Sequence, residues 1–102
     1  MRKIETEMQN ALRNRVNWSK ANTSVSVYNE GNQFVTLHGN CIASISNFGD
    51  IKLSSCGWET VTTKSRLNAI LDTFLHGLHV FQKDFQWFIG DDKFFDGYTI
   101  HR

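Results

Sequence analysis

From Thr23 onward the side chains alternate between apolar and polar over short stretches, and this pattern restricts the backbone mainly to β-strands. We predict strands over residues 24–28, 33–38, 41–46 and 51–55, because alternation with period two is typical of strands that bury one face. Glycine, asparagine and aspartate separate these stretches, and the chain contains no proline. Short strands joined by tight turns predict an antiparallel sheet.

A wide apolar stripe then replaces the alternation and predicts a helix. Its members follow helical spacing: Leu67, Ile70, Leu71, Phe74, Leu75 and Leu78. Thr62 or Thr63 is the expected N-cap, and Gly77 is the expected stop. A helix with so wide a stripe should lie across one face of the sheet.

The tail of the chain returns to strands. Residues 78–83 and 86–89 flank the pair Asp84-Phe85 and predict a hairpin, and a last short strand is expected near residues 98–100. The order of elements predicts an α+β fold in a single domain. We expect an antiparallel sheet of about six or seven short strands, one amphipathic helix packed on it, and an N-terminal helix.

Residues 3–15 predict that N-terminal helix, and its apolar stripe has one residue per turn: Ile4, Met8 and Leu12. So narrow a stripe suits a helix at the edge of a domain or one that pairs with a second copy of the chain, and the sequence leaves both open. Residues 17–24 are mostly polar and predict a connector. We therefore divide the chain into a helix with its connector, 1–22, and a compact domain, 23–102.

The two cysteines are expected on opposite faces of the sheet. A hairpin register that pairs Ile45 with Leu53 keeps one face apolar, and it puts Cys41 on that face and Cys56 on the polar one. This placement argues against a disulfide. Because the first residues carry acids and no apolar secretory segment, we expect both thiols to be reduced and buried as small apolar side chains.

Charge and length exclude several classes of protein. Eleven basic and ten acidic side chains give a net charge of +1, which argues against a strongly basic nucleic-acid coat and against an acidic DNA mimic. No apolar run approaches the roughly 18 residues that cross a bilayer, so no membrane partner is expected. With 40% hydrophobic and 21% charged residues, the chain of 102 residues is typical of a folded domain.

The start of the second predicted helix carries a candidate anion site. Thr62, Thr63, Lys64 and Arg66 fall there, and Trp58 lies just before it. Backbone N–H groups, hydroxyls and cations at a helix start can hold a phosphate or a nucleic-acid backbone, and cations placed there otherwise oppose the helix dipole. The alternative is that a threonine caps the helix and the cations are solvated, and the sequence leaves both interpretations open.

Exposed aromatic residues indicate a second candidate site. Phe48 and Phe85 fall at predicted hairpin tips, and Phe34 lies on the polar face of a predicted strand. Apolar side chains at such positions indicate a contact surface for another macromolecule. The alternative is that the tips fold back and cover the edge of the core.

No catalytic or metal-binding motif is complete in the sequence. His76 and His79 are three residues apart, but Gly77 is expected to end the helix between them. No nucleophile motif is present. We therefore expect no cofactor, no metal and no enzymatic activity.

One run of residues is distinctive: Trp58-Glu59-Thr60 leads into Thr62-Thr63-Lys64-Ser65-Arg66-Leu67-Asn68, a W-x-T-x-T-T-K-x-R-L-N pattern. Shorter segments accompany it: Leu37-His38-Gly39-Asn40, Gln86-Trp87-Phe88 and Phe95-Asp96-Gly97. Together these segments resemble small bacteriophage-encoded proteins of unknown function. The resemblance implies a viral origin and an intracellular site of action, and it carries over no catalytic residue.

These observations favour a small non-enzymatic phage accessory protein that binds a host or phage protein or complex. Such a protein would act as a host-takeover or anti-defence factor in the cytoplasm of the infected bacterial host. The alternative is a protein that binds nucleic acid or a phosphate ligand through the basic start of the second helix. A homo-oligomer built through the N-terminal helix is a further hypothesis.

Overall fold

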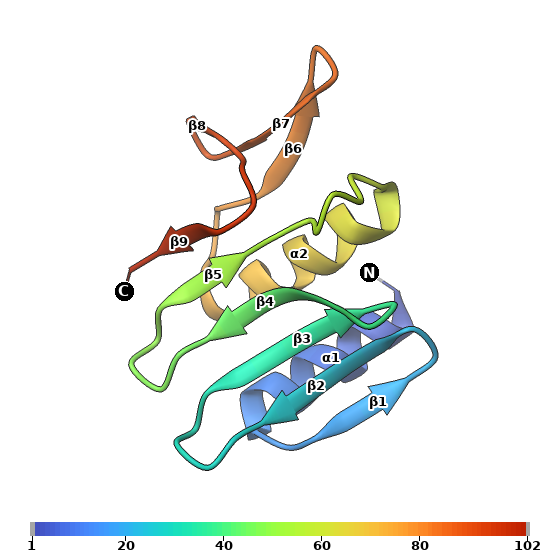
Figure 1. Cartoon of the computed structure of the whole chain (residues 1–102), viewed down its shortest axis with the longest axis vertical. Coiled ribbons are helices and arrows are strands. Elements are labelled where there is room, and N and C mark those ends of the chain that lie inside the picture. The colour runs from blue at the N-terminus through green and yellow to red at the C-terminus, as the bar shows by residue number, and fades with distance from the viewer. Residues whose placement is uncertain (1, 102) are drawn as a thin grey trace.

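The computed structural model describes residues 2–101, and within that range it contains two helices and nine strands (Figure 1). The helices are α1 (Lys3–Asn14) and α2 (Val61–Phe74). The strands are β1 (Trp18–Lys20), β2 (Thr23–Val27), β3 (Gln33–Leu37), β4 (Asn40–Ile45), β5 (Ile51–Leu53), β6 (Val80–Lys83), β7 (Gln86–Ile89), β8 (Asp92–Lys93) and β9 (Tyr98–Ile100). None of the helices in this range is long and apolar enough to cross a membrane.

The strands form two antiparallel sheets, which confirms the predicted α+β class. The larger sheet has the order β1-β2-β3-β4-β5-β9, so the last strand returns to lie beside β5 after the chain has built α2 and the second sheet. The smaller sheet, β6-β7-β8, projects from one end of the molecule (Figure 1). The strands predicted for the tail are therefore divided between two sheets.

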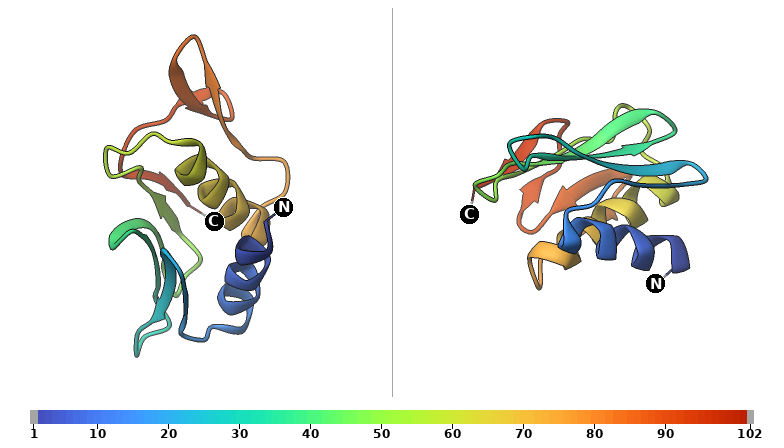
Figure 2. Two further views of the ribbon diagram at one scale, coloured as in Figure 1. Left: turned by 90° about the vertical axis from the view of Figure 1, so that its right-hand side faces the viewer. Right: turned by 90° about the horizontal axis from the view of Figure 1, so that it is seen from below.

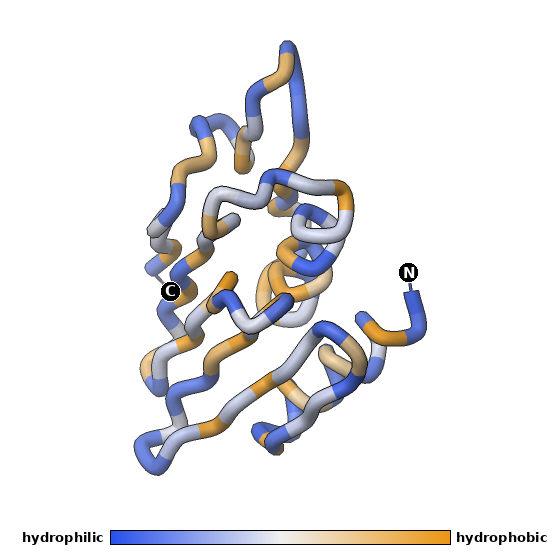
Figure 3. Tube along the Cα trace, turned by 45° about the vertical axis from the view of Figure 1, so that its right-hand side comes forward, coloured by the Kyte–Doolittle hydropathy of each residue, from blue (hydrophilic) through white to orange (hydrophobic). Residues whose placement is uncertain are grey.

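Both helices lie on the same face of the larger sheet, and the other face is open (Figure 2, right-hand view). The core between these layers takes Met8 and Leu12 from α1, Leu67 and Ile70 from α2, and the inward side chains of the strands. Apolar positions recur at intervals along the strands and along α2 (Figure 3). The narrow stripe of α1 is thus buried within the chain, and α1 shares one core with residues 23–101.

The predicted connector contains a strand that the sequence analysis missed. β1 pairs with β2, and Trp18 lies opposite Val25. Ala21 adopts φ +52° in the turn between the two strands. Because β1 is a three-residue edge strand with only one half-buried side chain, it carries no alternation that a pattern search could detect.

The hairpin of β4 and β5 has a register two residues away from the predicted one. Ile45 pairs with Ile51, and Leu53 pairs with Ala43, so the predicted pairing of Ile45 with Leu53 is wrong. The turn is closed by Ser46, whose N–H donates to the carbonyl oxygen of Asp50 at 2.8 Å. A shift of two residues preserves the side of the sheet, which is why the apolar face was still predicted correctly.

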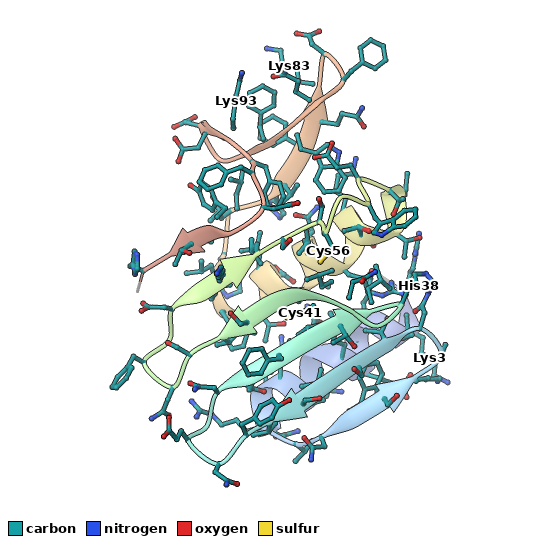
Figure 4. The ribbon with its side chains drawn as sticks, viewed as in Figure 1. Lys3, His38, Cys41, Cys56, Lys83 and Lys93 are labelled. Carbon is teal, nitrogen blue, oxygen red and sulfur yellow. The ribbon has the colours of Figure 1, made fainter. Side chains whose placement is uncertain are left out.

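Cys41 does not lie on the apolar face, and this prediction is also wrong. β4 pairs Ala43 with Val35 but Cys41 with Thr36, so Ile42 is an extra residue in a β-bulge. Because of the bulge, the residues before Ile42 point to the side of the sheet opposite to the one that simple alternation predicts. Cys41 is therefore exposed. Cys56 Sγ donates a hydrogen bond to the Cys41 carbonyl oxygen at 3.0 Å, and both thiols are free (Figure 4).

A buried ion pair joins α1 to α2. Arg66 Nη1 donates to Glu5 Oε2 at 2.8 Å, and both side chains are almost completely buried. Ser65 also donates to Glu5 Oε2, at 2.5 Å, and Arg66 Nε donates to Thr23 Oγ1 at 3.1 Å. Burial alone would raise the pKa of the Glu5 carboxyl, but the hydrogen bonds from Ser65 and Arg66 outweigh it and hold that pKa below the ordinary value of 4.5.

We predict that Glu5→Gln lowers the free energy of unfolding by about 3–5 kcal/mol at neutral pH, because it leaves the Arg66 charge buried without its partner. The stabilisation from a carboxyl with a lowered folded-state pKa is complete above its unfolded-state pKa and is lost as the pH falls through the folded-state pKa. The difference in stability between wild type and Glu5→Gln should therefore shrink below about pH 4.5.

Urea unfolding measured across an acidic pH series would test this expectation. The matched control is Glu7→Gln, because Glu7 pairs with Lys20 at 2.8 Å in a partly exposed position. An exposed pair of that kind contributes at most about 1 kcal/mol. Equal effects of the two substitutions would contradict the assigned role of Glu5.

One side-chain amide of α2 hydrogen-bonds the first residue of the smaller sheet, in addition to the apolar contacts of that sheet with the core. Asn68 Oδ1 accepts a hydrogen bond from the Val80 N–H at 2.7 Å, and Asn68 Nδ2 donates to the Val80 carbonyl oxygen at 3.0 Å. The amide thereby takes the place of a neighbouring strand at the outer edge of β6. This contact fixes where β6 starts, and it occupies backbone groups that an edge strand would otherwise leave unpaired.

Asn68→Ala should destabilise the fold by about 1–3 kcal/mol, because two backbone groups of a buried residue lose their partner. Hydrogen exchange should accelerate most at the Val80 amide, since this substitution removes the acceptor of that N–H. Asn10→Ala, at an exposed position of α1, is the control and should leave the Val80 amide protected. Unchanged protection of Val80 in Asn68→Ala would show that this contact does not hold β6.

Candidate binding surfaces

Both ends of α2 differ from the predicted ones. Thr60 is the N-cap: it is extended, and its Oγ1 accepts a hydrogen bond from the Thr63 N–H at 3.1 Å. Thr62 and Thr63, predicted as caps, both lie inside the first turn. At the other end the helix stops at Phe74, before Gly77, because the next residue is already extended. Thr62 is thus free of the capping role, whereas the side chain of Thr63 is buried against Thr60.

We predict that Thr60→Ala lowers the free energy of unfolding by about 1 kcal/mol, as the loss of an N-cap does. Thr62→Ala, two positions further on, should change it by less than about half of that, because its hydroxyl caps nothing. Thermal unfolding of the two variants would compare them directly. A larger loss in Thr62→Ala than in Thr60→Ala would contradict the observed cap.

A cavity of about 540 Å³ opens beside the start of α2. It brings together three residues that the sequence analysis singled out, Trp58, Thr62 and Thr63, with His38 from the turn between β3 and β4. The rest of its wall is uncharged: Leu37, Asn40, Ile42, Ser55 and Thr60. The cavity therefore offers an apolar floor with neutral hydrogen-bonding groups, and it lacks the cations that a phosphate site would need.

Arg66 is not part of an exposed anion site, in contrast to the sequence-based hypothesis. Its side chain is buried on the side of α2 that faces α1, where Glu5 neutralises its charge. Lys64 is half-buried and does not line the cavity. The two cations predicted to act together are thus separated by the helix, because residues two apart on a helix point in different directions.

The three phenylalanines proposed as an interface do not form one surface. Phe48 and Phe85 are exposed, at 86% and 93% of their surface, so neither tip folds back over the core. The two turns that carry them lie far apart, one at the end of β4 and β5 in the larger sheet and one at the end of β6 and β7 in the smaller sheet (Figure 1). Phe34 lies on the open face of the larger sheet, with its ring edge-on to Tyr28 at 5.0 Å.

The smaller sheet carries an aromatic surface that the sequence analysis did not identify. Phe81 and Phe88 are directly opposite each other on β6 and β7, and their rings stack with centroids 5.7 Å apart and planes 20° apart. The same face of this sheet carries three further side chains, and we call the five together the aromatic face: Phe81, Lys83, Gln86, Phe88 and Lys93. The opposite face buries Val80, Trp87 and Ile89.

The register of this hairpin follows from its turn. Asp84 and Phe85 are the two central residues, and both have positive φ, 52° and 65°. Such a two-residue turn suits the twist of a hairpin, although glycine or asparagine is preferred where φ is positive. A loop of two residues pairs Lys83 with Gln86, and counting back along both strands then places Phe81 opposite Phe88. The predicted hairpin therefore already contained the signal for this face.

The phenyl ring of Phe85 is exposed, and its backbone has an unfavourable conformation. A residue other than glycine at positive φ costs about 1–2 kcal/mol, and a bulky side chain there is uncommon. Phe85 nevertheless adopts φ 65° at the tip and is more exposed than the other large apolar residues of the described range. The fold tolerates this conformation at the one end of the molecule where the aromatic face also lies.

Two carboxylates near the smaller sheet, those of Asp92 and Asp96, accept hydrogen bonds from residues outside the aromatic face. Asp96 Oδ1 accepts hydrogen bonds from the N–H and the hydroxyl of Ser55, both at 2.8 Å, and these bonds outweigh burial and lower the pKa of Asp96. Asp92 lies on the opposite face of the sheet from Lys93, and its carboxylate accepts a bond from the Tyr98 hydroxyl at 2.6 Å. That hydrogen bond raises the pKa of Tyr98. Two lysines thus share the aromatic face with no aspartate or glutamate among its five residues.

The arrangement as a whole defines a small α+β protein whose projecting sheet presents an aromatic face with two lysines. Within residues 2–101, no three His, Cys, Asp or Glu side chains gather where they could hold a metal ion. The chain belongs to the Kyanoviridae Gp96 protein family, a bacteriophage family whose model matches residues 1–101. Neither the curated proteins nor the solved structures include a significant match to the chain.

Proposed function

We propose that this phage protein is a non-enzymatic accessory protein that acts by binding another macromolecule through the aromatic face of β6–β8. One observation carries the proposal: two phenylalanines in direct cross-strand register on the outward side of a projecting sheet. Phe81 exposes 42% of its surface, and the tip residue Phe85 exposes nearly all of it. Aromatic side chains supply much of the energy at binding surfaces, and clusters of them are rare on surfaces that bind nothing.

The position of the smaller sheet suits this role. One face is anchored by Val80, Trp87 and Ile89, and Asn68 holds the first residue of β6. The aromatic face is therefore presented by a supported element rather than by a loose loop, so little ordering is needed on binding. The site of action we propose is the cytoplasm of the infected bacterial host, where such a protein would serve as a host-takeover or anti-defence factor.

The alternative site at the start of α2 has less support. A phosphate in the cavity there would meet Thr62 and Trp58. It would meet neither Lys64, which does not line the cavity, nor Arg66, whose charge is neutralised inside the fold. Without a lysine or arginine in its wall, the cavity offers few contacts to a polyanion. Two classes of partner remain for the aromatic face itself, a host or phage protein and a nucleic acid.

Affinity capture from infected host cells would test the proposal. A tagged wild-type chain should retain a partner that the double variant Phe81→Thr/Phe88→Thr loses, because threonine preserves the strand but removes both rings. Phe48→Thr, at the distant exposed tip, is the control and should retain the partner. Treatment with nuclease divides the two partner classes. If Phe81→Thr/Phe88→Thr, verified as folded by circular dichroism, captures the same partners as wild type, the proposed surface is wrong.

A further inference from the structure

We infer that the aromatic face binds single-stranded nucleic acid, with bases stacked on Phe81 and Phe88 and the phosphate backbone contacted by Lys83 and Lys93. This inference rests on the proposed function, because it names the partner of the same surface. It is a different site from the start of α2, where the sequence analysis placed a nucleic-acid contact.

The aromatic pair provides the stacking element. The two residues lie opposite each other on adjacent strands, and their rings stack on each other with planes 20° apart. Phe81 is exposed and Phe88 is half-buried, so a base would extend this stack from its solvent side. Exposed aromatic side chains on sheet strands are the platforms on which many proteins stack unpaired bases. Stacking of this kind tolerates any base sequence, because every base presents a flat π-face.

The lysines lie where a backbone passing over the rings would run. Lys83 is two residues beyond Phe81 on β6, so it points to the same side of the sheet, and Lys93 lies directly opposite Phe88 on β8. Both lysines are exposed, and both lie at the projecting end of the molecule (Figure 4). The rings are therefore flanked by a cation along one strand and by a cation across the sheet.

The charge of the aromatic face itself, two lysines and no carboxylate, favours a nucleic acid over a protein as the occupant. Lysine is depleted in the centre of protein interfaces, whereas aromatic rings combined with lysine are typical of grooves for single strands. Asp92, the carboxylate of β8, faces the other way and is bonded to Tyr98. Asp84 and Asp91 occupy the turns at the ends of the strands and not the face itself. Gln86, opposite Lys83, adds a neutral hydrogen-bonding group.

The same features argue for a single strand and against a duplex. The bases of a duplex are stacked on one another and cannot lie on the two rings without being unpaired. A duplex is held mainly by its phosphates, and the chain has a net charge of only +1. Two lysine contacts imply a shallow salt dependence, with log K falling by about 1.4 per tenfold rise in salt for a single strand.

Fluorescence polarisation with the full chain tests the inference. The probes are a fluorescein-labelled oligothymidine of about twelve nucleotides, the matching oligouridine, and a duplex of the same length. We expect saturable binding of one or both single strands at low salt, weaker binding of the duplex, and the shallow salt slope given above. The comparison of oligothymidine with oligouridine tells whether DNA or RNA is preferred.

Four variants locate the site. Phe81→Thr/Phe88→Thr should weaken single-strand binding by at least about tenfold, because two stacking contacts are lost. Lys83→Glu/Lys93→Glu should weaken it and remove most of the salt dependence. Phe48→Thr and Lys3→Glu are the matched controls for an exposed phenylalanine and for an exposed lysine away from the smaller sheet, and both should bind as wild type.

Three results would overturn the inference: no saturable binding of either single strand, duplex binding as tight as single-strand binding, or equal losses in the control variants. None of them decides the proposed function. If a nuclease-resistant protein partner is still captured through Phe81 and Phe88, the surface is correct and its partner is a protein. If Phe81→Thr/Phe88→Thr also captures the same partners as wild type, both the proposed function and the inference are wrong.

Discussion

The buried ion pair between Glu5 and Arg66 fixes how the two helices of this protein pack against each other. A carboxylate and a guanidinium removed from water must remain paired, because either charge alone would cost several kcal/mol. Their partners extend the contact to Ser65 on α2 and Thr23 on β2, so one polar cluster joins both helices to the sheet. The N-terminal helix is consequently part of the core and cannot be released from it without exposing these charges.

Most of the distinctive run between Trp58 and Asn68 serves the fold. Thr60 caps α2, Arg66 pairs with Glu5, Leu67 is completely buried, and Asn68 holds the first residue of β6. Because these side chains are occupied by structural contacts, the binding surface that we propose lies elsewhere in the chain.

The sequence predicted the features that depend on neighbouring residues. Alternation placed Val25 and Val35 inward, helical spacing marked α2, and the two-residue gap at Asp84-Phe85 contained the register of β6 and β7. Features that depend on distant partners were missed. Arg66 meets a carboxylate 61 residues away, and the bulge that exposes Cys41 arises from how β4 pairs with β3. No local pattern distinguishes a buried, paired arginine from an exposed one.

The two sheets of the molecule differ in the side chains on their solvent-facing sides, and this difference distinguishes the aromatic face. Burying one side of any strand obliges the alternate residues to point outward, but it does not determine what they are. On the open face of the larger sheet those positions in β2 and β3 are mostly small and polar, as at Ser24 and Thr36, and Phe34 is the exception. On the smaller sheet the equivalent positions hold Phe81 and Phe88, although polar residues would serve the fold as well. A need for stability alone does not account for these rings, whereas the binding role that we propose for this face would require them.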